Sequence, residues 1–107
     1  MNDRFLSFLG ICRKAHRLSL GHDACLGSII NGNAKLCILT SDASDRLKKE
    51  FIKACGYNGR ELKYIETDYT SDDMKKAVGM RAAVLTADDE GFAKKTAELH
   101  EEMTGRN

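Results

Sequence analysis

The residues best suited to chemistry lie around Gly21. Gly21 precedes what looks like the start of a helix, and a glycine there lets backbone N–H groups point outward at an anion. A basic cluster comes just before it, and positive charge beside a helix terminus suits a phosphate backbone. This order of residue types predicts a site for phosphate groups, with RNA as the leading hypothesis. The cluster consists of Arg13, Lys14, His16 and Arg17.

The loop Gly79-Met80-Arg81 extends this hypothesis. It offers a glycine, a flexible apolar side chain and a cation. Lys35, which precedes an apolar run, adds a further positive charge. We expect the Lys and Arg side chains to neutralise phosphates, and Met80 with Arg81 to cover flipped or bulged bases.

His22 and Asp23 follow Gly21 directly and are expected to meet base edges at a bent internal loop of RNA. Aromatic stacking, which is common in proteins that bind single strands, finds little support, because the three tyrosines are not arranged as a platform. We therefore expect recognition of folded RNA rather than of a stretched single strand.

Each of these features also has a plainer structural explanation. Gly21 could simply cap a helix, and Arg13 and Lys14 could be surface charges that a helix C-terminus favours. Met80 could be core filler. The features are weak singly, and their order along one chain makes the case for RNA.

No constellation for catalysis accompanies these residues. The chain lacks the glycine-rich dinucleotide motif, the phosphate loop and the nucleophile elbow of hydrolases. Cys12 and His16 lie one helical turn apart, and His22 with Asp23 follows, but this spacing matches no structural zinc pattern. We expect no metal, no cofactor and no enzyme activity. Without a Cys-x-x-Cys pair, the cysteines are expected to be buried thiols rather than disulfides, and they are Cys12, Cys25, Cys37 and Cys55.

Amphipathic helices and short apolar strands alternate along the chain and must position these residues. This alternation predicts an α/β domain with helices on both sides of one sheet, and the length predicts one domain over residues 1–107. The expected helices span about 3–15, 21–30, 44–55, 71–78 and 88–103, and the expected strands span 18–20, 36–39, 62–65 and 82–85.

Composition and charge set further limits. No apolar run approaches the roughly 20 residues that cross a bilayer, and the N-terminus has no signal-peptide pattern, so we expect no membrane partner and a cytoplasmic location. The net charge of +1 is unevenly placed, because residues 1–64 carry +5 and residues 65–107 carry −4. This asymmetry suggests one electropositive face.

Five segments follow one another in a familiar order. They are residues 9–15 (LGICRKA), 20–23 (LGHD), 34–44 (AKLCILTSDAS), 78–84 (VGMRAAV) and 89–95 (DEGFAKK). The most specific stretches are 34–44 and 91–95. With these segments the chain resembles the kink-turn-binding ribosomal protein superfamily (the L-seven-Ae group), and within it the bacterial YlxQ-type ribosomal-like proteins. The similarity spans nearly all 107 residues.

This resemblance implies a three-layer α-β-α sandwich with a four-stranded mixed sheet. It also implies a noncatalytic RNA-binding protein, ribosome-associated or bound to a structured RNA such as ribosomal RNA or a kink-turn. In the superfamily a Gly-x-Asn-Glu-x-x-Lys segment and the loop before the last strand grip the RNA. The first falls on residues 21–27, where Gly21 matches, and the second falls on Gly79, Met80 and Arg81.

Three positions depart from the family pattern. Asp23 stands where the family has asparagine, Ala24 replaces the acid, and Gly27 replaces the lysine. Ionised aspartate only accepts hydrogen bonds, whereas asparagine also donates them. Losing the lysine removes a phosphate contact and should reduce the salt dependence of binding by about one unit. The alternative is therefore a protein–protein interaction module on the same scaffold, with RNA binding weakened or lost.

The RNA hypothesis depends on geometry. We expect the turn after Leu20 and the turn after Val78 to come together at one end of the sheet. Cations are expected to surround this shared rim, and the candidates are Arg13, Lys14, Arg17, Lys35 and Arg81.

Overall fold

The structure, a computed structural model, describes residues 3–105 of the chain. No helix among these residues is long and apolar enough to cross a membrane. The helices are α1 (Arg4–Lys14), α2 (His22–Ile30), α3 (Asp45–Gly56), the short 3-10 helix η1 (Tyr57–Gly59), α4 (Ser71–Val78) and α5 (Glu90–Thr104). The strands are β1 (Leu18–Leu20), β2 (Leu36–Leu39), β3 (Tyr64–Glu66) and β4 (Val84–Ala87).

The four strands form one mixed sheet in the order β1-β4-β2-β3. β4 is antiparallel to both of its neighbours, with Leu20 opposite Leu85 on one side and Leu39 opposite Val84 on the other. β2 and β3 are parallel, with Ile38 opposite Ile65. The C-terminal ends of β1, β2 and β3 therefore lie at the same end of the sheet, where β4 begins.

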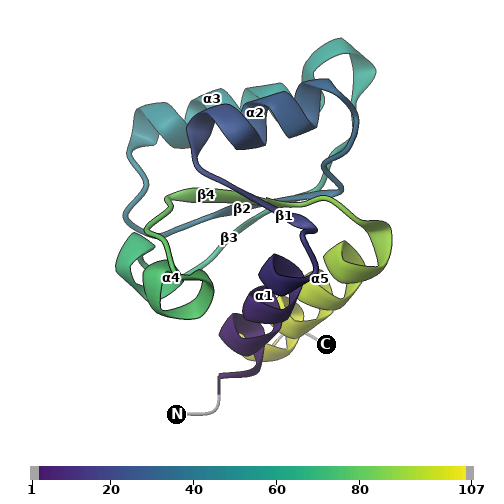
Figure 1. The fold of residues 1–107 in the computed structure, drawn as a ribbon. Coiled ribbons are helices and arrows are strands. Elements are labelled where there is room, and N and C mark those ends of the chain that lie inside the picture. The colour runs from purple at the N-terminus through teal and green to yellow at the C-terminus, as the bar shows by residue number, and fades with distance from the viewer. Residues whose placement is uncertain (1–2, 106–107) are drawn as a thin grey trace.

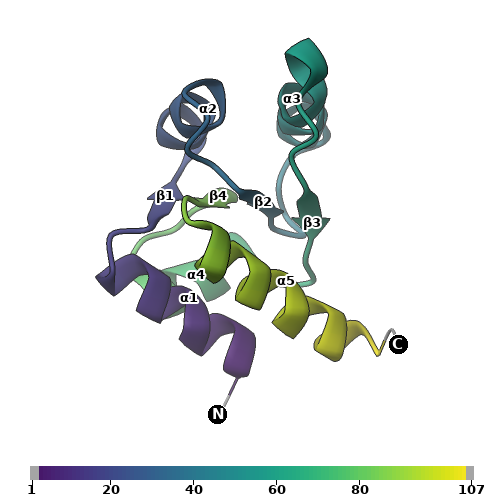
Figure 2. The same ribbon diagram turned by 90° about the vertical axis from the view of Figure 1, so that its right-hand side faces the viewer.

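Helices cover both faces of the sheet (Figures 1 and 2). α2 and α3 lie on one face, and α1, α4 and α5 lie on the other. Each face has its own apolar core, one built around Phe51 and Leu39 and the other around Phe5, Leu9 and Ile38. The predicted three-layer sandwich with a four-stranded mixed sheet is confirmed.

Local sequence explains where the helices begin. Asp3 caps α1 by accepting a hydrogen bond from the N–H of Leu6, and Ser44 caps α3 in the same way from Leu47. Thr70 and Asp73 form a reciprocal capping box at the start of α4, as the sequence predicted.

Two strands begin two residues later than predicted, and they end one residue later (β3) and two residues later (β4). The predicted strand 62–65 is Tyr64–Glu66, and the predicted strand 82–85 is Val84–Ala87. The second error arose because Thr86 reads as a polar loop residue, although it is fully buried in β4. Its hydroxyl donates to the carboxylate of Asp88 at 2.8 Å, and this bond lets a polar side chain occupy the interior.

All four cysteines are free and buried, as predicted. Cys25, Cys37 and Cys55 belong to the core between the sheet and helices α2 and α3. The Cys25 thiol donates to the backbone oxygens of Ser19 and Val84 at 3.4 and 3.5 Å. Burial raises the pKa of Cys25 to about 12, so it stays protonated at neutral pH.

Candidate nucleic-acid interface

The turn after Leu20 and the turn after Val78 meet at one end of the sheet, as expected from the sequence. The N–H of Gly21 donates to the carbonyl oxygen of Val84 at 3.0 Å, and this bond ties the start of α2 to the segment that follows α4. We call this region the loop end and define it as residues 21–23, 40–44 and 79–83 (Figure 1).

Gly21 opens α2 without a side-chain cap. Its φ of 88° lies in the region that glycine adopts readily, and a Cβ added to it would meet nothing within 4 Å. The first amides of α2 therefore face an open approach, and a helix N-terminus attracts anionic or carbonyl oxygens. The plainer explanation of Gly21 as an N-cap is also correct, since it holds that position.

The imidazole of His22 is held by two carboxylates. Its Nδ1 lies 2.8 Å from Oδ1 of Asp23, and its Nε2 lies 2.9 Å from Oε2 of Glu50 in α3. These two bonds, with that to Asp23 the stronger influence, raise the pKa of His22 above its ordinary value. The ring also packs edge-on against Phe51, with 5.5 Å between ring centroids.

The segment 79–83 presents Met80 to solvent. Gly79 ends α4 in the left-handed conformation, with φ of 86°, and turns the chain outward. Met80 is 46% exposed, so its alternative role as core filler is wrong. An exposed methionine on a shaped turn offers a flexible apolar contact.

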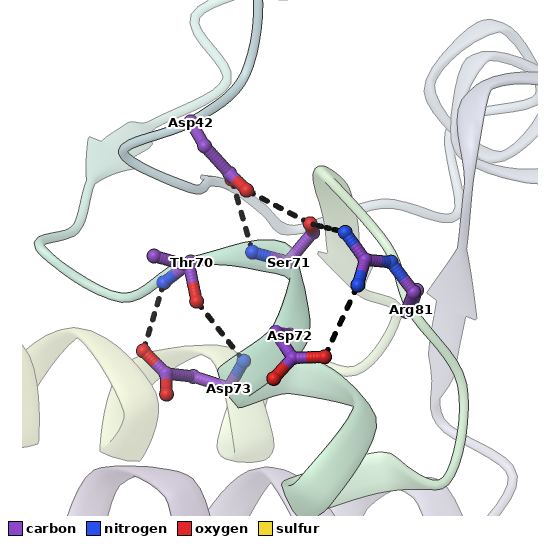
Figure 3. Close-up of polar contacts among 6 residues, drawn as sticks. All are labelled: Asp42, Thr70, Ser71, Asp72, Asp73 and Arg81. Atoms are coloured by element: carbon purple, nitrogen blue, oxygen red, sulfur yellow. Dashed lines mark hydrogen bonds and ion pairs between the residues drawn. The ribbon is translucent and has the colours of Figure 1, made fainter.

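Arg81 is bound within the protein (Figure 3). Its Nη1 lies 3.1 Å from Oδ1 of Asp72, and its Nη2 donates to Oγ of Ser71 at 3.1 Å. Both partners belong to the first turn of α4. The guanidinium therefore braces the segment 79–83 against the helix that precedes it.

Asp42 completes this brace, although the sequence analysis did not select it (Figure 3). Its carboxylate accepts hydrogen bonds from the hydroxyl and the N–H of Ser71, each at 2.9 Å. It also accepts a bond from the hydroxyl of Thr40 at 2.8 Å. These bonds, with that from Thr40 the largest influence, lower the pKa of Asp42. The signal available in the sequence was Thr40-x-Asp42, which directly follows a buried strand.

Four predicted cations lie away from the loop end. The carbonyl oxygen of Arg17 accepts from the N–H of Asp88, and the N–H of Lys35 donates to Ala87, so both residues lie where β4 ends. Arg13 and Lys14 occupy the last turn of α1, which leads into β1 at that same end. The expectation of cations around a shared rim is wrong for these residues, because helix C-termini favour cations and α1 ends at the far end of the sheet. We call the group Arg13, Lys14, Arg17 and Lys35 the basic end.

The charges at the two ends differ in their partners. At the loop end, His22 and Arg81 are paired with carboxylates. At the basic end, none of the four cations forms an ion pair with any residue in 3–105. The ammonium group of Lys35 donates to the carbonyl oxygen of Gly32 at 3.1 Å. The basic end thus carries four cations without a carboxylate partner among residues 3–105, whereas His22 and Arg81 at the loop end have one.

The residues considered for zinc do not converge. Cys12 is buried in the apolar stripe of α1, and His22 is engaged by its two carboxylates. Over residues 3–105, no group of three or more His, Cys, Asp or Glu side chains could hold a metal ion.

Comparison with solved structures agrees with this architecture. A Bacillus halodurans C protein of unknown function superposes with a TM-score of 0.85 and 28% identity, over 94% of this chain and 99% of that one. A Giardia lamblia 15.5kD RNA binding protein shares the fold, with a TM-score of 0.70 and 18% identity, over 98% of this chain and 92% of that one.

Sequence comparison identifies the group. A protein of Bacillus subtilis (strain 168) described as RNA-binding protein YlxQ is 33% identical over 92 residues, which are 85% of this chain and 89% of that protein. A protein of the same description from Enterococcus faecium is 29% identical over 96 residues, which are 90% of each chain. The predicted resemblance to YlxQ-type proteins is confirmed. A family model matches residues 4–97, and the chain therefore belongs to the ribosomal protein L7Ae/L30e/S12e/Gadd45 family.

Proposed function

We propose that this chain is a noncatalytic RNA-binding protein that recognises a structured, kink-turn-like RNA through its loop end. In this proposal residues 1–107 act as one RNA-binding domain, associated with the ribosome or with another structured RNA. The observation that carries it is the meeting of a helix N-terminus without a side-chain cap, at Gly21, with the braced segment 79–83. Family membership and the description of both relatives as RNA-binding proteins support it.

Each group at the loop end has a distinct role in this proposal. The open amides of α2 after Gly21 donate to phosphate or base oxygens. Asp23, whose side chain is fully exposed, accepts hydrogen bonds from base amino groups. Met80 covers an unstacked base, and Arg81 holds the turn that presents it. Paired charges and a fixed turn favour recognition of RNA shape over general attraction to phosphate.

The test is a gel-shift titration with a kink-turn RNA and with a mutant RNA that lacks the sheared G·A pairs. We expect tighter binding to the kink-turn, because only the bent loop exposes bases to the loop end. Equal binding to both would contradict recognition of the bend.

A pair of protein variants locates the site. Met80→Ala should weaken kink-turn binding about tenfold, which corresponds to roughly 1.4 kcal/mol. Ile30→Ala is the matched control, because Ile30 is 59% exposed but lies at the far end of α2. Equal losses in the two variants would place the RNA elsewhere.

A second candidate function is a protein-interaction module, which one surface favours. An apolar groove of about 360 Å³ lies between α2 and α3 and is lined by Leu26, Ile30 and Tyr57 among others. Ile30 and Tyr57 are both more than half exposed, an arrangement typical of protein contacts. The absorbance ratio at 260 and 280 nm after purification in low salt separates the candidates. Copurified nucleic acid favours the RNA function, and its absence favours the module.

A further inference from the structure

We propose that the RNA site extends beyond the loop end, along a polar groove between β1 and α2, and ends at the basic end, where Arg17 with Arg13 and Lys14 binds the phosphate backbone. This inference rests on the proposed function and deepens it. In this inference, the base-paired stem that flanks the bent RNA loop contacts the basic end. That contact lies about one length of α2 away from the loop end.

The groove provides a path between the two ends of the sheet. It has a volume of about 510 Å³ and is lined along α2 from Asp23 to Asn31, and across from it by His16 and Arg17. α2 has nine residues and is roughly 13 Å long, which suits a strand of RNA rather than a single phosphate. We call it the edge groove, because β1 is an edge strand of the sheet.

The middle of the edge groove has free space beside the backbone of α2. Gly27 lies there, and a Cβ added to it would meet nothing within 4 Å. The residues of α2 that line the wall between Asp23 and Asn31 are small, and they are Ala24, Gly27 and Ser28. A backbone can approach α2 closely at this point.

Charge favours the Arg17 half of the groove. Asp88 lies in that half, but its carboxylate already accepts hydrogen bonds from Ser19, Ser28 and Thr86, at 2.5, 2.7 and 2.8 Å. These hydroxyls engage both carboxylate oxygens, and Arg17 forms no ion pair with Asp88 or with any other residue in 3–105. The exposed carboxylate of Asp23 lies at the other mouth, so the charge along the groove becomes more favourable to phosphate toward Arg17.

The cations at this end sit on an ordered turn. The N–H of Arg17 donates to Cys12, and the N–H of His16 donates to Arg13, each at 3.0 Å, which closes the chain tightly after α1. Arg13, Lys14 and Arg17 are exposed and form no ion pair among the described residues. Exposed cations without an internal partner bind phosphates without first breaking internal contacts.

The experiment compares two kink-turn RNAs, one with minimal flanking stems and one with lengthened stems, in salt titrations of binding. The variant Lys14→Ala/Arg17→Ala should lose about tenfold affinity for the lengthened RNA, and its log–log salt slope should fall by about one per lost contact. Affinity for the minimal RNA should stay within about twofold of the unmodified protein. The matched control, Lys53→Ala/Lys95→Ala, removes two exposed lysines that belong neither to the edge groove nor to the basic end and should change neither affinity.

The outcomes separate this inference from the proposed function. If the double variant binds both RNAs as the unmodified protein does, the extended site is overturned and the loop-end function stands. If it weakens both RNAs equally, or if the control variant weakens the lengthened RNA as much, the cations act by general attraction and the extended site is again overturned. If the unmodified protein binds neither RNA, both proposals fall. Circular dichroism of each variant confirms that it folds.

Discussion

The two central strands carry the same short pattern at opposite ends of the sheet. Thr40 follows β2 and donates to Asp42, and Thr86 in β4 donates to Asp88, both at 2.8 Å and both across two residues. Each aspartate also accepts a serine hydroxyl from a helix, Ser71 of α4 at the loop end and Ser28 of α2 at the basic end.

The two clusters differ in what they hold. Ser71 also accepts a hydrogen bond from Arg81, so the Asp42 cluster fixes the segment 79–83. The Asp88 cluster consists of hydroxyls alone, and two of its donors, Ser28 and Thr86, are buried. One cluster therefore shapes a surface turn and engages its cation, whereas the other seals the interior and leaves the nearby cations free.

The largest expected effect is that of Asp88→Ala on stability. Removing the carboxylate leaves the buried hydroxyls of Ser28 and Thr86 without their acceptor, and each costs about 1–3 kcal/mol. We expect a loss of about 3 kcal/mol in the free energy of unfolding, measured by urea titration. Asp88→Asn keeps an acceptor oxygen and should lose less. A loss of stability no greater than that of Asp42→Ala would contradict the conclusion that the Asp88 cluster seals the interior.

Asp42→Ala should cost about 1 kcal/mol, the typical net value of a hydrogen bond, because Asp42 is exposed and water replaces part of its role. The pKa of Asp42 is lowered in the folded state, so its contribution is present above its ordinary pKa of 3.8 and is lost as pH falls through the lower folded value. The stability gap between variant and unmodified protein should therefore close in acid. Asp68→Ala, at an exposed site without a hydrogen-bonded side chain among the described residues, should show no such gap.

Arg81→Ala should have a smaller effect on global stability, below about 1 kcal/mol, because its ion pair with Asp72 is exposed. The effect should be local. Amides in the segment 79–83 should exchange with deuterium faster, since the bonds to Asp72 and Ser71 no longer hold the turn. Arg46→Ala, which changes another exposed arginine, serves as the control. Unchanged exchange in Arg81→Ala would contradict the role of Arg81 in holding the segment 79–83.

The smallest expected effect concerns His22. Its pKa, followed by NMR, should lie above the ordinary 6.5, and Glu50→Gln should bring it down by removing one of two carboxylate partners. Because the folded pKa is raised, the pairing stabilises the protein fully below pH 6.5 and less as pH rises through the folded value. Glu61→Gln, which changes an exposed acid elsewhere, should leave the titration unmoved.

Sequence patterns located elements well where one signal dominated. The run from Leu36 to Leu39 is buried throughout, and its predicted bounds match the structure. β3 and β4 were misplaced because each ends on a residue that a local pattern assigns to a loop, the charged Glu66 in β3 and the buried Thr86 near the end of β4. Their places in the sheet depend on neighbouring strands and on Asp88, which a local pattern does not contain.

The sequence predicted only part of the candidate site, because the rest depends on contacts between distant elements. Glycines mark turns, so Gly21 and Gly79 could be selected from the sequence, and the structure brings their turns to one end. The placement of Arg17 and Lys35 depends on strand direction, which follows from pairing across the sheet. Asp42 and Glu50 were missed because their roles exist only once α4 and α2 pack beside them.

The positions of the buried thiols allow the opening of the two helical layers to be followed separately. Cys25, Cys37 and Cys55 are sealed between the sheet and the layer of α2 and α3, and Cys12 lies in the other layer. An alkylating reagent can reach each thiol only when its own layer opens. The labelling rate of each cysteine, measured by mass spectrometry, therefore reports how often one side of the sandwich opens, independently of the other side.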